Sequence, residues 1–473
     1  MLRTCREFED CKHLLKDGRS ALMKPSPRQA SLEPRAAARG RDSVPDLIVF
    51  ACILFNFALC FVDTNIVALG PVHVMAAEAA ILGFAFFTPF IFGTRQIERM
   101  DYLLFALLIN WVFLSIFRQT LNPKLFRDVA IMPIFIMLGQ ASRGVTFHKR
   151  MYALHVTILL FALWEAVSLS TFVSFFSVAD FFAHTRGLQN DDWWINNGLF
   201  ISSVRPESRF LFPSLPVHRL SSVFLEPVSL GNYVIIATIW LAASWREMPN
   251  WIRWSAILIN TLLLVGSDSR MATMTCLVIL VAACFRRRIP RYAAVPIAPV
   301  VVALMFGSVA ILGLEKGQDD FGGRLAYSVQ VFQDFGVEDY FGVSLAKMKA
   351  VEDAGFAYLV ISQSIVIVVV LWAAIFVKGL STPNARFVYF AVATYLALNL
   401  TVSWALFSIK TAALLWFLLG RANREDADLA VSATDIGKAI ASPATSDRQL
   451  ITQPPLSSNN KHDWNRLQIR WEP

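Results

Sequence analysis

The sequence predicts an all-α polytopic membrane protein, and its composition and hydropathy carry this prediction. Hydrophobic residues make up 56% of the 473 residues, and charged residues make up only 16%. Soluble domains usually contain about 25% charged residues. Apolar stretches also recur along the chain, and a helix needs roughly 20 mostly apolar residues to cross the hydrocarbon core of a bilayer. We therefore expect most of the chain to be surrounded by lipid.

The two ends of the chain are polar. Residues 1–45 contain ten lysines and arginines. This segment is longer than the charged start of a signal peptide, and no small-residue cleavage site follows the first apolar run. Residues 421–473 are rich in serine, aspartate, proline and asparagine, a composition typical of disorder. Both segments are interpreted as disordered cytoplasmic tails.

A polytopic membrane domain is predicted for residues 46–420, between the two tails. Its twelve apolar segments are 46–62, 72–93, 101–117, 128–141, 151–175, 229–244, 252–268, 271–285, 293–313, 355–377, 386–402 and 404–420. An even number of spans places both termini on one side. Assigning that side to the cytoplasm collects about thirty of the 43 lysines and arginines there, as the positive-inside rule predicts.

Two of the predicted outer loops are long, at about residues 176–228 and 314–354. Loops of this length in compact proteins are usually functional or disordered. Their phenylalanine, tryptophan, leucine and valine content favours packed structure over the bilayer, with short amphipathic helices.

Several classes of site are not expected. The net charge is +8, but the basic residues lie in tails and short loops instead of forming a patch for nucleic acid. Cys5 and Cys11 lie in the N-terminal tail and the other four cysteines lie in apolar runs, so neither an outer disulfide nor a zinc site is predicted. No P-loop or dinucleotide motif is present. The sequence therefore predicts no metal and no cofactor.

Arg219 and Glu226 are the first candidate functional residues. They lie in RLSSVFLEPVSLGNY, residues 219–233, just before a predicted span. An outer arginine opposes the positive-inside trend, and its planar fork can donate two parallel hydrogen bonds to a phosphate. The alternative is a loop salt bridge or an arginine that caps the end of the span.

Three segments resemble, in the same order, the O-antigen polymerase and O-antigen ligase superfamily. They are RLSSVFLEP, VGSDSRMATM with Arg270, and GGRLAYSVQVFQDFGVEDYFGVSL with Arg324, followed by DAGFAYL with Asp353. FLEPVSLGNY is most similar to exopolysaccharide polymerases. Ser222 stands where the family usually has glycine, and Val228 where asparagine often follows the proline. The second outer loop lacks the histidine of the ligases, which favours a polymerase.

The resemblance implies a GT-C-like enzyme of the bacterial inner membrane that acts on its periplasmic face. Its substrate would be an oligosaccharide repeat unit on undecaprenyl pyrophosphate, and chain-length regulator and export proteins would be partners. The leaving pyrophosphate needs its growing negative charge stabilised. We expect Arg219, Arg270 and Arg324 to do this, with Arg205 and Arg209 in reserve.

An acceptor hydroxyl also needs its proton removed, which a carboxylate can do. Glu226 and Asp353 are the candidates. Two alternatives stay open: Glu226 could orient Arg219 by an ion pair, and Asp353 could cap the helix that starts near residue 355.

Other candidates have competing structural interpretations. Trp193 and Trp194 could stack on a sugar ring or belong to the interfacial aromatic belt. His218 could touch substrate or be structural. Glu165 and Lys410 lie within apolar segments and could pair or line a cavity.

Two other functions remain open. A ligase would move a finished glycan onto an acceptor, and twelve spans would also suit a flippase of lipid-linked oligosaccharides. A transporter is expected to show two related halves and interrupted spans that meet near the midplane, whereas the polar residues here concentrate in two outer loops.

Overall fold

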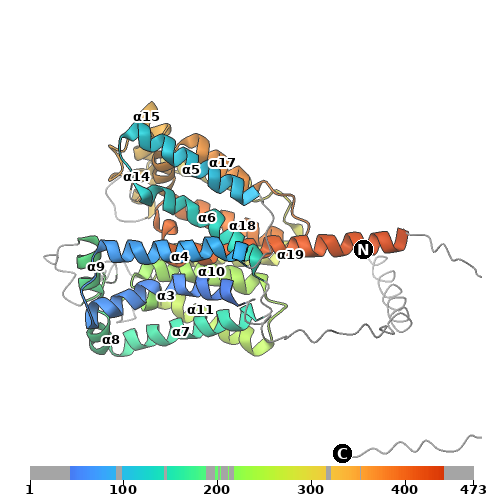
Figure 1. The fold of residues 1–473 in the computed structure, drawn as a ribbon, viewed down its shortest axis with the longest axis horizontal. Helices are drawn as coiled ribbons and strands as arrows, with labels where there is room; N and C mark the ends of the chain where they lie inside the picture. Colours follow the sequence, from blue (N-terminus) through green and yellow to red (C-terminus); the bar gives the residue numbers. More distant parts are fainter. Residues whose placement is uncertain are drawn as a thin grey trace, which may run out of the picture. The chain divides into compact units, whose positions relative to one another are not determined.

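The computed structural model describes residues 43–91, 99–142, 146–187, 198–200, 203, 211, 218–315, 321–351 and 353–441. In these ranges all regular structure is helical. With the labels of Figure 1, the elements are α3 (Val44–Asn65), α4 (Pro71–Ile91), α5 (Arg99–Arg118), α6 (Pro123–Ala141), α7 (Phe147–Val167), α8 (Leu169–Phe175), α9 (Val178–Arg186), η4 (Ser222–Phe224), α10 (Pro227–Ala243), α11 (Asn250–Ser267), α12 (Arg270–Cys284), η5 (Arg286–Arg288), α13 (Ile297–Leu312), α14 (Phe321–Gln333), α15 (Val337–Tyr340), α16 (Gly355–Gln363), α17 (Ile365–Phe376), α18 (Pro383–Leu400), η6 (Ala405–Phe407) and α19 (Ile409–Ala441).

The chain divides into two compact units, at residues 1–427 and 428–473. In the first unit α10 packs against α11 and α12, α3 packs against α4, and α7 packs against α11. Figure 1 shows α3, α4, α7, α10 and α11 running side by side, with α5 and α17 inclined to them. The end of α19 is the described part of the second unit.

Local sequence explains where several helices begin. The side chains of Asn122, Ser269 and Thr382 accept hydrogen bonds from the backbone in the first turns of α6, α12 and α18. Such N-caps satisfy backbone N–H groups that have no partner within the helix. Proline opens α6, α10 and α18, because the first helical position needs no N–H.

The core of the first unit is apolar and tightly packed. Trp240 of α10 and Trp416 of α19 are buried among aliphatic side chains. The backbones of α6 and α19 approach so closely that a Cβ at Gly139 would lie 2.2 Å from the Phe417 carbonyl oxygen, and one at Gly420 would lie 2.1 Å from that of Ile136. Only glycine fits at such a crossing.

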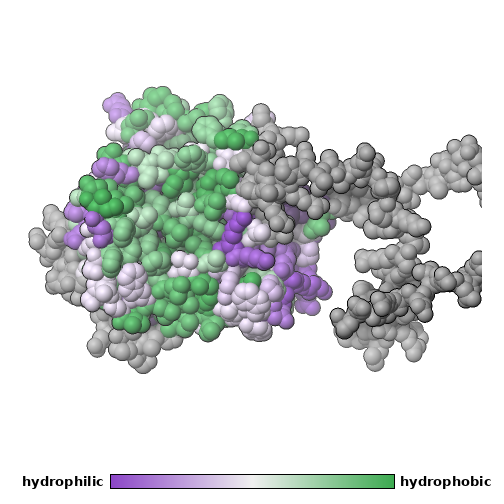
Figure 2. Space-filling view, turned by 60° about the horizontal axis from the view of Figure 1, so that its bottom comes forward, coloured by the Kyte–Doolittle hydropathy of each residue, from purple (hydrophilic) through white to green (hydrophobic). Residues whose placement is uncertain are grey.

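The surface of the first unit is also apolar over large areas. Phe87 on α4 and Phe105, Phe113 and Ile116 on α5 are exposed. Figure 2 shows hydrophobic side chains over much of one face, with hydrophilic side chains gathered toward its left and right ends. Apolar exposure on this scale marks a surface that contacts lipid or another apolar partner.

Among the described residues, α3, α4, α5 and α7 are each long and apolar enough to cross a membrane, and α16 with α17 make a fifth candidate if the bent pair is one span. These helices are those of a membrane protein. Each of the twelve predicted spans coincides with a helix or a helix pair. However, α10, α12 and α13 are shorter apolar helices, so the number twelve stays a prediction.

The helices differ from the predicted spans at three places. The segment predicted as 151–175 breaks at Ser168 and continues as α8. The segment predicted as 355–377 bends by 108° between α16 and α17, where Ser364 has φ +77°. Helix α19 continues to Ala441, past the end of the predicted span at residue 420. Short helices α9, α14 and α15 lie in the predicted outer loops.

Candidate functional site

The segment from His218 to Glu226 is held by Glu165, a fully buried carboxylate on α7. Glu165 accepts hydrogen bonds from the backbone N–H of Ser221 at 3.0 Å, from its hydroxyl at 3.0 Å, and from the N–H of Ser222 at 2.6 Å. It also lies 3.3 Å from Nε2 of His218. A buried charge is stable only with such partners. Glu165 therefore anchors the segment that carries Arg219.

Ser222, at the position where the resembling family has glycine, has φ +51°. This left-handed conformation favours glycine because it crowds a Cβ. The Ser222 hydroxyl donates to the carbonyl oxygen of Ile158 at 2.6 Å, and this bond together with the one from its N–H to Glu165 offsets the strain. The segment thus keeps a glycine-like turn without glycine.

Arg219 is buried, with 2% of its surface exposed. Its Nε donates to the carbonyl oxygen of Ser267 at 3.0 Å, and the neighbouring Leu220 N–H donates to that of Gly266 at 2.8 Å. These carbonyls belong to the last turn of α11, which has no helical donors for them. The α11 end turns sharply at Asp268, with φ +44°. Arg270 begins α12 on the far side of this turn and is exposed.

Arg324 lies in the first turn of α14 and is exposed. The next residue, Leu325, is buried in a small apolar cluster against which Met271, the residue after Arg270, also packs. Arg219 and Arg270 therefore flank one turn, and Arg270 and Arg324 flank one cluster. Three arginines predicted from separate sequence motifs lie on adjoining elements.

Glu226 is paired with two cations. Nζ of Lys410 lies 2.5 Å from one carboxylate oxygen and Nη1 of Arg186 lies 2.8 Å from the other. Ser229 donates to Glu226 at 2.8 Å, and Lys410 also donates to the Phe224 carbonyl oxygen at 3.0 Å.

This geometry corrects one expectation about Glu226 and weakens another. Within the described residues Glu226 contacts Lys410, Arg186 and Ser229, so it does not orient Arg219 by an ion pair. Burial alone would raise the pKa of Glu226, but the charges of Lys410 and Arg186 outweigh it and lower the pKa to about 2. An efficient general base needs a pKa near the working pH. Glu226 is therefore a poor proton acceptor.

Asp353 is exposed, and the N-cap position of α16 is occupied by Ala354, without a side-chain cap. The alternative that Asp353 caps this helix is therefore wrong. The predicted substrate-contacting residues Arg205, Arg209, Trp193 and Trp194 lie outside the described residues.

Sequence reasoning missed the partners of Glu226. The sequence did indicate a buried contact for Lys410, because a lysine in an apolar segment usually faces a partner or a cavity. The partner considered for it, Glu165, binds the Ser221–Ser222 backbone instead. For Arg186 the sequence contained no signal beyond its place in the first predicted outer loop. A further pair in this region joins His184 on α9 to Asp63 on α3 at 3.2 Å.

A second group of charges lies on α4 and α6. Arg127 pairs with Glu78 and with Asp128, and the Tyr358 hydroxyl donates to Asp128 at 2.5 Å. Glu78 is close enough to Arg186 and Lys410 to interact with both electrostatically. The two groups of charges therefore interact electrostatically, without an ion pair between them in the described residues. In the described part of the chain, no three histidine, cysteine or acidic residues are grouped to hold a metal ion.

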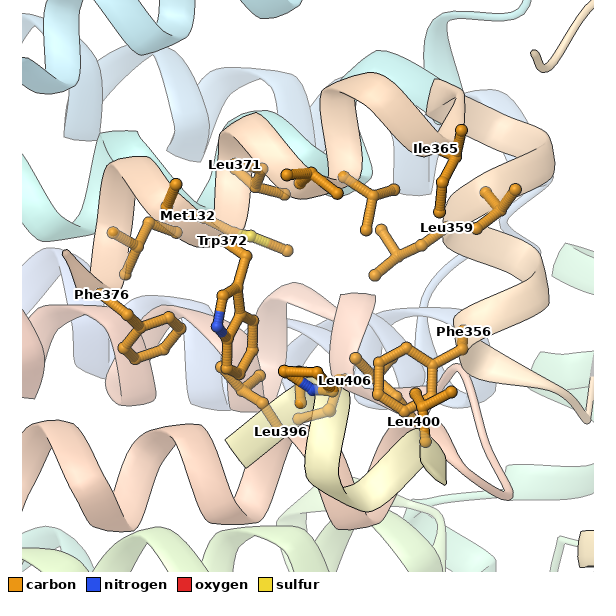
Figure 3. A pocket seen from close by; sticks show the side chains of 18 of the residues that line it. Met132, Phe356, Leu359, Ile365, Leu371, Trp372, Phe376, Leu396, Leu400 and Leu406 are labelled. Atoms are coloured by element: carbon orange, nitrogen blue, oxygen red, sulfur yellow. The ribbon is translucent and has the colours of Figure 1, made fainter. Parts of the chain in front are cut away.

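Two cavities have mostly apolar walls. The first, of about 470 Å³, lies between α13 and the bent pair of α16 and α17, with α18 and α19 completing its wall. Figure 3 shows Trp372 projecting into it, Phe376 at one end and Phe356 at the other. Phe332 of α14 also lines it and packs against the apolar cluster beside Arg324.

The second cavity, of about 520 Å³, lies between α4, α5 and α6. Leu82, Phe86 and Ile134 contribute to its walls, and three charged residues line it as well: Glu78, Lys124 and Arg127. Of these two cavities, the second alone has charged residues in its wall.

The fold and these sites define a helical membrane protein with charged groups beside apolar cavities. Comparison with protein-family models, with curated proteins and with solved structures gave no match. The resemblance to the polymerase and ligase superfamily therefore depends on the three sequence motifs alone.

Proposed function

We propose that this protein is a glycosyltransferase that polymerises undecaprenyl-pyrophosphate-linked repeat units into exopolysaccharide on the periplasmic face of the inner membrane. The observation that carries the proposal is the placement of Arg219, Arg270 and Arg324 on adjoining elements. The three come from separate motifs, yet Arg219 and Arg270 flank one turn, and Arg270 and Arg324 flank one apolar cluster. The donor pyrophosphate would bind there.

Arginines suit this reaction because the leaving pyrophosphate gains negative charge as the glycosidic bond breaks. One arginine about 4 Å from a phosphate oxygen interacts with it by roughly 4 kcal/mol in a partly wet site, before desolvation is counted. Several arginines together can stabilise the leaving group without a metal. The turn at Asp268 and the hydrogen bond to Ser267 hold Arg219 in advance of binding, which lowers the cost of ordering it.

The cavities support a lipid-linked substrate. A polyprenyl chain requires an apolar path beside the phosphate site, and the first cavity extends along α17 to Phe332, next to the cluster that flanks Arg270 and Arg324. Polymerisation joins two lipid-linked units, so it needs room for two chains. The second cavity, between α4, α5 and α6, supplies a separate apolar slot.

The two alternative functions, a ligase and a flippase, explain fewer of these features than a polymerase does. A ligase would also join a lipid-linked glycan to an acceptor, but residues 314–354 contain no histidine, where the resembling ligases carry one. A flippase would carry one lipid-linked unit across the membrane and does not require three arginines on one side. Deleting the gene separates these functions by the lipid-linked glycan that remains.

A polymerase deletion leaves single undecaprenyl-linked units on the periplasmic side, with no polymer. A flippase deletion leaves the same unit on the cytoplasmic side. A ligase deletion leaves intact polymer that is not attached to its acceptor. Either of the last two results contradicts the proposal.

The residue test is replacement of Arg219 in the deletion strain. We expect Arg219→Ala to abolish polymer, and Arg219→Lys to be nearly as poor because lysine cannot make two parallel hydrogen bonds. Arg421→Ala is the matched control, since Arg421 is also largely buried, at 12% side-chain exposure, and donates to Ser142 away from the proposed site. Gel analysis of the polymer and immunoblots of the membranes are the measurements. Normal polymer from a stable Arg219→Ala protein would remove Arg219 from the site.

A further inference from the structure

His218 has the surroundings of a positioned base. Its Nε2 lies 3.3 Å from Oε1 of Glu165, and the side chain is 17% exposed. Because an ionised carboxylate only accepts hydrogen bonds, Nε2 carries the hydrogen and Nδ1 carries the lone pair. Within the described residues Nδ1 makes no hydrogen bond. His218 therefore presents a free basic nitrogen one residue away from Arg219.

The other candidate bases lack these properties. Glu226 is paired with two cations, which lower its pKa to about 2. Asp353 is exposed and has no orienting hydrogen bond or ion pair within the described residues. A base held by a third group is a recurring arrangement in enzymes. Among these candidates, only His218 is both oriented by a carboxylate and adjacent to Arg219 in the chain.

We propose that His218 removes the proton from the acceptor hydroxyl and that Glu165 is its positioning residue. This inference rests on the proposed polymerase function. The acceptor oxygen forms a bond to the anomeric carbon of the donor, and the bond from that carbon to the pyrophosphate oxygen breaks, its electron pair leaving with the pyrophosphate. The acceptor proton moves to Nδ1 of His218 and is later released to water.

Glu165 serves this step in two ways. It holds the imidazole in the tautomer that leaves Nδ1 unprotonated, and its negative charge stabilises the imidazolium that forms. The other ionisable groups around this segment are Arg219 beside it in the chain, Asp63 on α3 with His184 and Arg186 on α9, Glu226 before α10 with its partner Lys410 on α19, and Asp268 in the turn after α11. Within the described residues, none of these groups makes a hydrogen bond or ion pair with the His218 ring, whereas Glu165 does.

The test is the pH dependence of polymer formation by membranes supplied with the lipid-linked repeat unit. Wild-type activity should fall as the pH is lowered, because a protonated Nδ1 cannot take the proton of the acceptor hydroxyl. His218→Gln should lower the rate about 100-fold or more and remove this acid limb. Glu165→Gln should lower the rate less than His218→Gln does and should keep an acid limb, because His218 is still the base but its imidazolium is no longer stabilised by a carboxylate.

His184→Gln is the matched control, since His184 is another histidine paired with a carboxylate in the same outer region. It should leave both rate and pH profile unchanged, and thermal melting should show that all variants are folded. A folded His218→Gln protein with the wild-type rate overturns the role of His218 and leaves the polymerase proposal standing. A wild-type rate that does not change between about pH 5 and 8 also overturns the role of His218 and leaves the polymerase proposal standing. Wild-type membranes that form no polymer overturn both proposals.

Discussion

Glu226 shows how two residues far apart in sequence determine the chemistry of a third. Its carboxylate lies between Lys410, which is 1% exposed, and Arg186, which is about half exposed. Glu226 precedes Pro227 at the start of α10, so this bridge ties α9, α10 and α19 together. Removing one partner from such a pair leaves an uncompensated charge in a poorly solvated place. We therefore assign Glu226 to holding the site together.

The first prediction concerns the pH dependence of stability. The folded pKa of Glu226, about 2, lies below the ordinary value of 4.5, so its stabilising contribution is complete above about pH 4.5 and is lost as the pH falls toward 2. The contribution at neutral pH is roughly 3 kcal/mol, since each pKa unit corresponds to about 1.4 kcal/mol. Thermal melting in detergent from pH 7 to 3 should show a larger loss for wild type than for Glu226→Gln.

Glu247→Gln is the control for this experiment. Glu247 is also paired, with His148 at 2.9 Å, but its side chain is 53% exposed. Exposed pairs contribute little to stability, so this variant should follow the wild-type curve. Identical pH curves for wild type and Glu226→Gln would show that the bridge is not stabilising.

At the scale of elements, α4, α5 and α6 enclose the second apolar cavity, whose wall includes Glu78, Lys124 and Arg127. Gly83 of α4 lines this cavity, and a Cβ there would meet nothing within 4 Å. A larger side chain can therefore enter the cavity without displacing its walls. Gly307 on α13 is equally open but does not line either cavity.

The element-scale prediction compares Gly83→Leu with Gly307→Leu. Leucine at position 83 should occupy space that the second lipid chain needs and lower polymer formation about tenfold, which corresponds to about 1.4 kcal/mol of binding. Leucine at position 307 should have no effect. Both changes favour helix formation, so neither should unfold the protein. The measurements are polymer yield and native mass spectrometry of the lipids that remain bound. Equal yields would show that this cavity holds no substrate chain.

At the scale of the whole molecule, helix length and sequence hydropathy predict different numbers of membrane-crossing helices. Among the described residues, four helices are each long and apolar enough to cross the membrane, and the bent pair α16–α17 is a fifth candidate, whereas hydropathy and charge along the sequence predict twelve spans. Short helices such as α10 can still cross if neighbouring helices bury them, and most of α10 is buried. Whether a short helix crosses the membrane therefore depends on how the helices pack as well as on its own hydropathy.

The topology prediction can be checked with single cysteines in a protein whose own six cysteines are replaced by serine. Glu338 on α15 and Arg287 in η5 are both exposed, and the twelve-span arrangement places them on opposite sides. A membrane-impermeant maleimide should label Glu338→Cys in intact cells and Arg287→Cys only after permeabilisation. The same labelling pattern at both positions would rule out the predicted topology.

Much of the helical fold could be predicted from the sequence. Apolar runs, prolines at helix starts and capping residues such as Asn122 and Ser269 are local signals, and a helix satisfies its own backbone hydrogen bonds in lipid. The break at Ser168, the bend at Ser364 and the continuation of α19 to Ala441 were not predicted. Hydropathy measures apolarity along the chain and does not detect changes in direction.

The candidate site was predictable as a set of residues but not as a set of contacts. Composition and hydropathy were enough to predict the membrane class and the positions of most helices, and the motifs that contain Arg219, Arg270 and Arg324 could be found in the sequence. Only the tertiary structure decided that Glu226 pairs with Lys410, 184 positions away, and that Glu165 binds His218 and the Ser221–Ser222 backbone. The physical reason is that composition and helix propensity act locally, whereas the partner of a buried charge depends on which helices pack together.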